Sequence, residues 1–493
     1  MNSKHFINGL QVAFLVLFLS SSFSSAHLKL QPPPMPQPTP NPQTSIVEPI
    51  PNLPERSNAQ THDIPQPSIP QHTTNPQPTK HDIPQPSIPQ QTTNPQQTTH
   101  DIPQPSIPKH TINSQPSTPQ ASPSGDALDS SISYQGTFKK VYAFGDSYTD
   151  TGNAKLLGGL KSFVTDLISK FASLADPNGG KNLPGSRLCN GKLVIDFLCD
   201  SLGLPTPPAY KDTSANFSKG VNFAISGSTG LSGDFFAAHK IAHALMWKAI
   251  PETFKTQLDW FTKHLAEVEC KGLSDVDCKG SMNNSLFWVG EMGGNDYSRT
   301  LGSSISIPWL TEMNIGHVFN LVKTLIERGA KYLVVQGLPP AGCCPLQLAL
   351  SKFHDRDGMG CASLANGLIK AHNKLLQKKL EILRKLFPHC VISYVDYSSA
   401  YKNVLSNHKQ YNFQEPFKAC CGAGGGPLNF DLHRLCGSVG TSTCKHPNQF
   451  INWDGVHLTE AMHKVLSDLF FHKPGFCQPP FLQLIKHKKG LLI

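Results

Sequence analysis

Short apolar runs that stop at a glycine or a polar residue recur along the second part of the chain. A run of four or five apolar residues predicts a strand buried on both faces, because a strand with one wet face alternates apolar and polar positions. Four runs have this character, at residues 141–144, 286–290, 332–335 and 391–395. The pattern therefore predicts at least four interior strands.

Between these runs, apolar positions recur every three or four residues, which indicates amphipathic helices. One such pattern covers residues 318–326, and a longer one covers 364–386 and ends near Pro388. Buried strands that alternate with helices predict an α/β fold, a three-layer sandwich with a mostly parallel central sheet. Ligands of such sheets bind beyond the carboxyl ends of the strands, so the polar residues that follow each strand are the candidates for a site.

The first part of the chain has a different composition. More than half of the 42 prolines lie between Pro32 and Pro123, and the motif His-Asp-Ile-Pro-Gln-Pro-Ser-Ile-Pro starts at His62, His81 and His100. Proline lacks an amide hydrogen and fixes φ, and the few apolar residues do not offset the entropy of ordering. We therefore expect residues 27–136 to be a disordered proline-rich linker. A plain spacer and a segment that associates with the cell-wall matrix both fit this composition.

The amino terminus has the features of a secretory signal. Lys4 and His5 precede a short apolar stretch, and small residues lead up to a predicted cleavage after Ala26. We expect residues 1–26 to be a signal peptide, 27–136 the linker and 137–493 the folded domain of a secreted, extracellular or cell-wall protein. No second run is long and apolar enough to predict a transmembrane segment.

The charge and the cysteine content of the chain further limit the class of protein to which it can belong. The formal net charge of +9 comes without an extended basic block, which argues against a nucleic-acid partner. Oxidising conditions would pair several of the 13 cysteines, and the spacing suggests loops closed by Cys270/Cys278 and Cys436/Cys444. The odd count leaves at least one cysteine unpaired in a monomer. We expect the protein to be a monomer. Sequons at Asn216 and Asn283 predict a glycoprotein.

Three segments carry residues of chemical interest, and two of them directly follow predicted strands. Ser147 comes after Gly145, where a sharp turn would expose it at the start of the next helix near backbone N–H groups. Asn295 follows the second run and offers an amide donor. Asp454 and His457, three apart, can place a carboxylate against an imidazole on one turn. Taken singly, these residues also fit a helix cap, a turn and a surface loop.

Together, a nucleophile, a donor and an acid–base pair are what acyl transfer requires. The sequence contains no G-x-S-x-G, H-E-x-x-H or G-x-x-x-x-G-K-[ST] motif, so it gives no motif evidence for an ordinary α/β-hydrolase, a zincin or a P-loop enzyme.

Four ordered blocks resemble those of the plant GDSL esterases/lipases, which are SGNH hydrolases. The blocks are residues 144–153, 220–229, 293–297 and 453–461. The likeness extends from Val141 almost to the end of the chain. Tyr148 stands where the family name has leucine, and Ser226 where many plant members have glycine. The proline-rich front resembles, in style only, the anther-specific proline-rich members.

This resemblance implies the SGNH/flavodoxin-like hydrolase fold and a secreted serine ester hydrolase. Ser147 would be the nucleophile, His457 the base and Asp454 the group that orients the imidazole. The backbone N–H groups of Ser147 and Gly227 and the side chain of Asn295 would form the oxyanion hole. No metal and no organic cofactor is implied.

Two alternatives stay open at this point. The same triad serves an acyltransferase that passes the acyl group to an acceptor other than water. A catalytically silent cell-wall structural or binding protein is the second alternative, although such a relative would be expected to have lost a site residue. The natural substrate, a small-molecule or lipid ester, is not fixed by these blocks.

Overall fold

The computed structural model describes residues 132–157, 187–241, 252–438 and 440–491. The predicted signal peptide and most of the predicted linker lie outside these residues. Within them, a six-stranded sheet has the order β10-β5-β4-β3-β1-β2. Five strands are parallel, and β10 runs antiparallel to β5. The strands of this sheet are β1 (Lys140–Phe144), β2 (Gly220–Asn222), β3 (Ser285–Val289), β4 (Tyr332–Gln336), β5 (Val391–Val395) and β10 (Cys477–Gln478).

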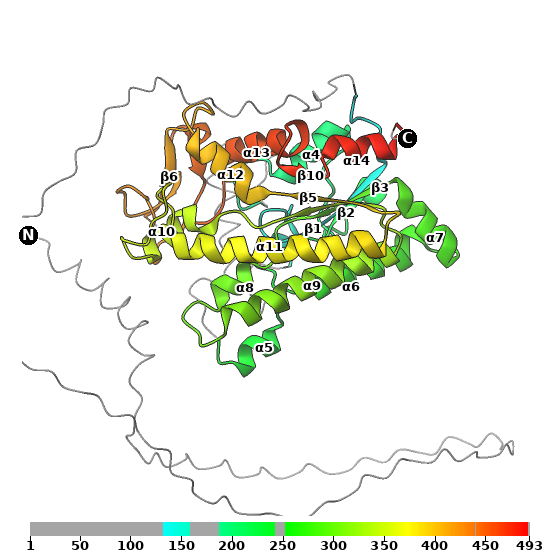
Figure 1. The fold of residues 1–493 in the computed structure, drawn as a ribbon, viewed down its shortest axis with the longest axis horizontal. Helices are drawn as coiled ribbons and strands as arrows, with labels where there is room; N and C mark the ends of the chain where they lie inside the picture. The colour runs from blue at the N-terminus through cyan, green and yellow to red at the C-terminus, as the bar shows by residue number, and fades with distance from the viewer. Residues whose placement is uncertain (1–131, 158–186, 242–251, 439, 492–493) are drawn as a thin grey trace, which may run out of the picture. The chain divides into compact units, whose positions relative to one another are not determined.

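Helices cover both faces of the sheet, which confirms the predicted three-layer fold (Figure 1). On one face lie α4 (Val194–Leu202), α12 (Tyr397–Ser406), α13 (Glu460–His472) and α14 (Phe481–Lys488). On the other lie α6 (Phe254–His264), α9 (Ile307–Glu327) and α11 (Ser363–Leu386).

Shorter elements connect these layers. The remaining helices are α2 (Asn153–Leu156), α5 (Gly233–Ala238), α7 (Asp275–Ser281), α8 (Gly294–Arg299) and α10 (Pro345–Leu350). Single helical turns are η1 (Phe217–Lys219), η2 (Leu265–Glu269), η3 (Met282–Asn284), η4 (Ala341–Cys343) and η5 (Pro447–Gln449). Two small ribbons pair β6 (Glu415–Ala419) with β9 (Phe450–Asn452), and β7 (Cys421–Gly422) with β8 (Ser442–Thr443).

The strands send successive side chains into two separate cores. In β1, Val141 and Ala143 pack under α4 and α13, whereas Tyr142 and Phe144 pack under α6 and α9. Because both faces are dry, the strand is a continuous apolar run in the sequence, and this is why the pattern located it. The same alternation holds in β3, where Trp288 and Phe287 enter opposite cores.

The long helix α11 matches the pattern predicted for residues 364–386. Leu376, Leu380 and Leu383 face the sheet and are buried, each contributing about 1.5–3 kcal/mol through the apolar area removed from water. The helix ends at Leu386 because the residue before Pro388 is pushed out of the helical region. The other pattern, at 318–326, is the second half of α9, whose first turn carries Pro308.

Four disulfides join described cysteines. They are Cys270–Cys278, Cys343–Cys361, Cys420–Cys444 and Cys421–Cys436. The predicted Cys270/Cys278 pair is confirmed.

The predicted Cys436/Cys444 pair is wrong. The antiparallel pairing of β7 with β8 brings Cys444 beside Cys420, whose carbonyl accepts the Cys444 N–H at 2.8 Å, and Cys436 is left to Cys421. Five cysteines remain unpaired and buried: Cys189, Cys199, Cys344, Cys390 and Cys477.

Candidate active site

Ser147 lies in a tight turn at the carboxyl end of β1. Gly145 starts the turn with φ of 153°, and a Cβ there would lie 3.0 Å from the Thr149 side chain. The carbonyl of Asp146 accepts the N–H groups of Thr149 and Asp150 at 3.1 and 2.9 Å, which closes the turn. Only glycine therefore fits this position easily, and the turn holds the serine hydroxyl beyond the end of the strand.

The expectation that Ser147 begins a helix is wrong. Helix α2 starts only at Asn153. The reason is Asp150, whose carboxylate accepts the N–H groups of Gly152 and Asn153 at 2.7 Å and of Ala154 at 3.1 Å. These are the N–H groups that a helix leaves free at its start, so the helix begins after Asp150.

Asp454 and His457 lie in the loop after β9 and reach back to this turn. The His457 Nε2 lies 2.9 Å from the Ser147 Oγ, and its Nδ1 lies 2.8 Å from an oxygen of Asp454. The other Asp454 oxygen accepts the backbone N–H groups of Val456 and His457, at 2.6 and 2.7 Å. The three side chains are buried, with residue exposures of 4, 5 and 6% for Ser147, His457 and Asp454. The fold thus brings together three residues that the sequence places up to 310 positions apart.

Asn295 lies in the first turn of α8, beside the serine turn. Its side-chain amide donates to the carbonyl of Ser228 at 3.1 Å and to the carboxylate of Asp146 at 3.3 Å. Gly227, the residue before Ser228, lies in a turn after β2 with φ of 79°. Asn295 and the Gly227 turn therefore meet at the carboxyl edge of the sheet, next to Ser147.

Asp296 also links helix α8, which carries Asn295, to the segment that follows Gly227. Its carboxylate accepts the N–H groups of Gly230 and Leu231, both at 2.9 Å. Burial raises the pKa of this carboxyl group to about 7, against the lowering effect of these two hydrogen bonds. The segment that carries Gly227 is thus fixed relative to the helix that carries Asn295.

Two buried acids at the site were not predicted from the sequence, Asp146 and Glu291. Burial raises the pKa of Asp146 to about 7, although the Tyr148 N–H and the nearby His457 lower it. Burial also raises the pKa of Glu291 well above its ordinary value, and the charge of Asp146 adds to that rise. The sequence signal for both was their place directly after a strand, since Asp146 and Glu291 are each two residues beyond the paired ends of β1 and β3.

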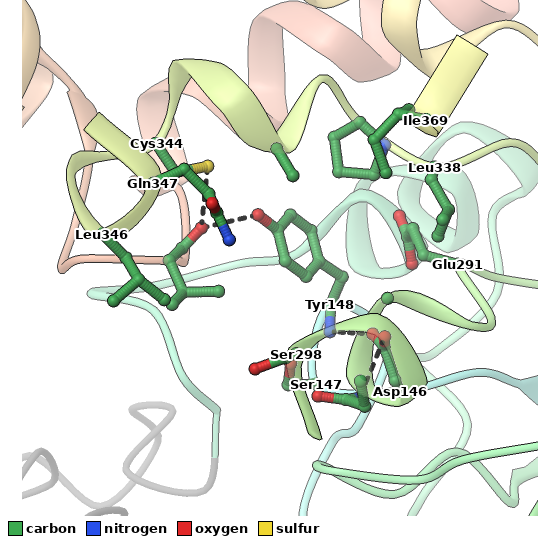
Figure 2. Close-up of a pocket in the computed structure, with 15 residues that line it drawn as sticks. Asp146, Ser147, Tyr148, Glu291, Ser298, Leu338, Cys344, Leu346, Gln347 and Ile369 are labelled. Atoms are coloured by element: carbon green, nitrogen blue, oxygen red, sulfur yellow. Dashed lines mark hydrogen bonds between the residues drawn. The ribbon is translucent and has the colours of Figure 1, made fainter. Parts of the chain in front are cut away.

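A cavity opens next to Ser147 (Figure 2). Tyr148 stands in its wall, with its hydroxyl donating to the carbonyl of Val456 at 2.7 Å. Much of the apolar wall comes from the segment after β4 and from α10 and α11, and the loop after β9 adds to it. Its apolar residues are Leu338, Pro339, Ala341, Leu346, Ile369 and Val456. The site therefore pairs a serine hydroxyl with a largely apolar pocket.

Within the described ranges, no group of three histidine, cysteine or acidic side chains is placed to hold a metal ion. None of the helices in the described part of the chain is long and apolar enough to cross a membrane.

Comparison with known proteins identifies the family of this chain. The family model described as GDSL-like Lipase/Acylhydrolase matches residues 141–470. GDSL esterase/lipase At3g48460 of Arabidopsis thaliana is 41% identical over 365 residues, which are 72% of this chain and 91% of that protein. Acetylajmalan esterase 2 of Rauvolfia serpentina is 36% identical over 343 residues, 66% of this chain and 88% of that protein. The residues matched by the family model include Ser147, Gly227, Asn295, Asp454 and His457.

Proposed function

Because the chain belongs to the GDSL-like lipase/acylhydrolase family and is a carboxylic ester hydrolase, we propose that it cleaves esters with Ser147, His457 and Asp454 as its catalytic triad. The observation that carries the proposal is the unbroken hydrogen-bond chain from the Ser147 hydroxyl through the His457 imidazole to the Asp454 carboxylate. A serine hydroxyl is a weak nucleophile unless a base within hydrogen-bond distance takes its proton.

The reaction then proceeds in two halves. His457 Nε2 accepts the Ser147 proton while Oγ attacks the ester carbonyl carbon, and the same proton passes to the leaving alcohol as the C–O bond breaks. Water enters, gives its proton to His457 and attacks the acyl-enzyme, and Ser147 recovers its proton as the acid leaves. Asp454 keeps the Nδ1–H of His457 pointing away from the serine, so that Nε2 is free to act as the base.

The negative oxygen of each tetrahedral intermediate needs hydrogen-bond donors. We assign this role to the backbone N–H groups of Ser147 and Gly227 and the side-chain amide of Asn295. The two N–H groups of the Asn295 amide already have acceptors, Ser228 and Asp146. The longer bond, to Asp146, is the one that would weaken as the amide turns toward the substrate oxygen. Such donors act mainly on the transition state, which raises kcat rather than lowers KM.

We also propose that the protein is secreted, with residues 1–26 removed and a proline-rich linker ahead of the catalytic domain. Four disulfides support an oxidising compartment. The sequon residues Asn216 and Asn283 are both exposed, as a glycosylation site requires. Association of the linker with the cell-wall matrix belongs to the same proposal.

Kinetics of single variants test the triad. With 4-nitrophenyl butyrate, Ser147→Ala and His457→Ala should each lower kcat by about 1000-fold or more, because each removes a member of one cooperating unit. Ser298→Ala is the matched control, since Ser298 lines the same cavity but is not the serine bonded to His457. Activity of Ser147→Ala within tenfold of the wild type would refute the assignment.

A further inference from the structure

Glu291 is a buried acid in the wall of the substrate cavity that the proposed mechanism does not use. It follows β3 after one glycine, and its residue exposure is 2%. One carboxyl oxygen accepts a long hydrogen bond from the Thr149 hydroxyl, at 3.4 Å, and that hydroxyl in turn accepts the Trp288 indole N–H at 3.3 Å. The other oxygen, Oε1, has no partner on another residue in the described part of the chain. The Glu291 backbone N–H also hydrogen-bonds this carboxyl group, so the one side-chain partner in the described residues is the distant Thr149 hydroxyl.

Glu291 is a polar residue in a largely apolar part of the cavity wall. Figure 2 shows Glu291 and Leu338 on one side of the Tyr148 ring, and Cys344 and Gln347 on the other. No lysine or arginine lines the cavity in the described residues. An apolar pocket with a few placed polar groups is typical of small-molecule sites, where the polar groups set orientation and specificity.

The protonation state of Glu291 decides what it can recognise. Burial raises the pKa of its carboxyl group well above the usual range, and the neighbouring Asp146 raises it further. A raised pKa favours the neutral form of this group, which carries one O–H donor and free acceptor lone pairs. A neutral acid of this kind suits a hydroxyl group, which also donates and accepts. It gives no ion pair to an ammonium group.

We propose that Glu291 is a specificity residue whose carboxyl group hydrogen-bonds a hydroxyl substituent on the otherwise apolar part of the ester substrate. The substrate class is then a hydroxylated ester, in contrast to a plain alkyl ester. The inference rests on the proposed function, because it assumes that the cavity beside Ser147 takes the substrate. Binding would give the Glu291 carboxyl group a hydrogen-bond partner from the substrate and would cover the apolar wall with the carbon chain.

Isosteric pairs of substrates test this directly. In one pair, 4-nitrophenyl 3-hydroxybutanoate is compared with the 3-methylbutanoate, and in the other, the 6-hydroxyhexanoate with the heptanoate. Each pair exchanges a hydroxyl for a methyl group, near the carbonyl or far from it. The wild-type protein should favour the hydroxylated member of at least one pair by roughly 3- to 10-fold in kcat/KM, the worth of one neutral hydrogen bond. Glu291→Met, of similar length and shape, should bring that ratio to about 1.

Controls separate Glu291 from other polar groups in the cavity. Glu291→Gln keeps a donor and an acceptor and should retain most of the preference, as should Ser298→Ala and Gln347→Leu. Equal rates within both pairs for the wild type would overturn the inference, as would a preference that survives in Glu291→Met or disappears in Ser298→Ala. A faster 6-aminohexanoate ester would also contradict it, since that would indicate an ionised Glu291.

Two further outcomes also have a defined consequence for the inference. If Glu291→Met does not fold, as judged by its melting curve, a crystal structure of Ser147→Ala with the preferred hydroxylated ester replaces it. The hydroxyl should lie within hydrogen-bond distance of the Glu291 carboxyl, and any other position rejects the inference. If the wild type cleaves none of the four esters, the proposed function itself fails and takes this inference with it.

Discussion

Asp146 connects the turn that carries Ser147 to the side chain of Asn295. One of its oxygens accepts the Tyr148 N–H at 3.1 Å, next to the proposed nucleophile, and the other accepts the Asn295 amide at 3.3 Å. An ionised carboxylate holds that amide near the serine turn. We therefore expect Asp146 to be a positioning residue, acting on the substrate only through Asn295.

Asp146→Asn should lower kcat by about 10- to 100-fold and change KM little, because a misplaced oxyanion donor affects the transition state most. Burial raises the pKa of Asp146 toward neutrality, so acid protonates it within the working range and makes the wild type resemble the variant. The ratio of wild-type to variant kcat should thus be larger at pH 8 than at pH 6. A ratio that stays constant across this range would contradict the role.

The sequence located the serine, histidine, aspartate and asparagine because each belongs to a motif that follows a strand or precedes a helix. Asp146 and Glu291 were not singled out, although both lie inside or beside those motifs. In a sequence, an acid next to glycine is most simply interpreted as a solvated turn residue. Burial changes that meaning, and the burial arises only because β1 and β3 are neighbours in the folded sheet.

The loop that carries Asp454 and His457 depends on a neighbouring disulfide-bonded segment. The Cys420 and Cys421 N–H groups donate to the carbonyls of Asn452 and Trp453, at 3.0 and 2.6 Å. Both cysteines are in turn bonded to the segment that contains β8. Two cross-links thus hold the chain that flanks the proposed base.

Replacing Cys421 and Cys436 together by serine should lower kcat several-fold as well as the melting temperature. Loss of a native disulfide costs about 2–5 kcal/mol, and here part of that cost falls on the position of His457. The matched control is the Cys270/Cys278 pair replaced by serine, which should lower the melting temperature only. Equal effects of the two double variants on kcat would show that the segment does not support the site.

At the level of elements, long and uniform patterns were predictable and short ones were not. The four predicted runs each cover at least four of the five residues of β1, β3, β4 or β5. β2 and β10 have three and two residues, too few for a pattern, and they are strands only because β1 and β5 supply their partners. The helix expected directly after Gly145 does not form there. It begins later because the Asp150 carboxylate accepts the N–H groups at the start of α2.

At the scale of the whole molecule, the folded part begins earlier than the composition alone suggests. Tyr134, ahead of the predicted boundary at residue 137, stacks on His472 with ring centroids 5.0 Å apart and donates to the carbonyl of Phe471 at 2.7 Å. The predicted boundary was placed where the proline-rich composition ends. The structural boundary is set by contacts, and Tyr134 already packs against the folded domain. A catalytic fragment should therefore keep Tyr134.

Deleting residues 27–131 should leave kcat/KM for a soluble ester within about threefold of the full chain, because core-forming residues are rare in this stretch. Deleting residues 27–136 should instead lower the melting temperature, since it also removes Tyr134 from the cluster around Phe481. Equal melting temperatures for the two deletions would show that the Tyr134 contacts contribute nothing.

The central claim, that Ser147 is the nucleophile activated by His457, is tested most directly by covalent labelling with diisopropyl fluorophosphate. Attack of the activated Oγ on phosphorus expels fluoride and leaves a stable phosphoryl-serine, which peptide mass spectrometry locates. We expect one label per chain, on Ser147, with ester hydrolysis lost in proportion to labelling, and negligible labelling of His457→Ala. Loss of activity with the label on another residue, or full activity with Ser147 labelled, would contradict it.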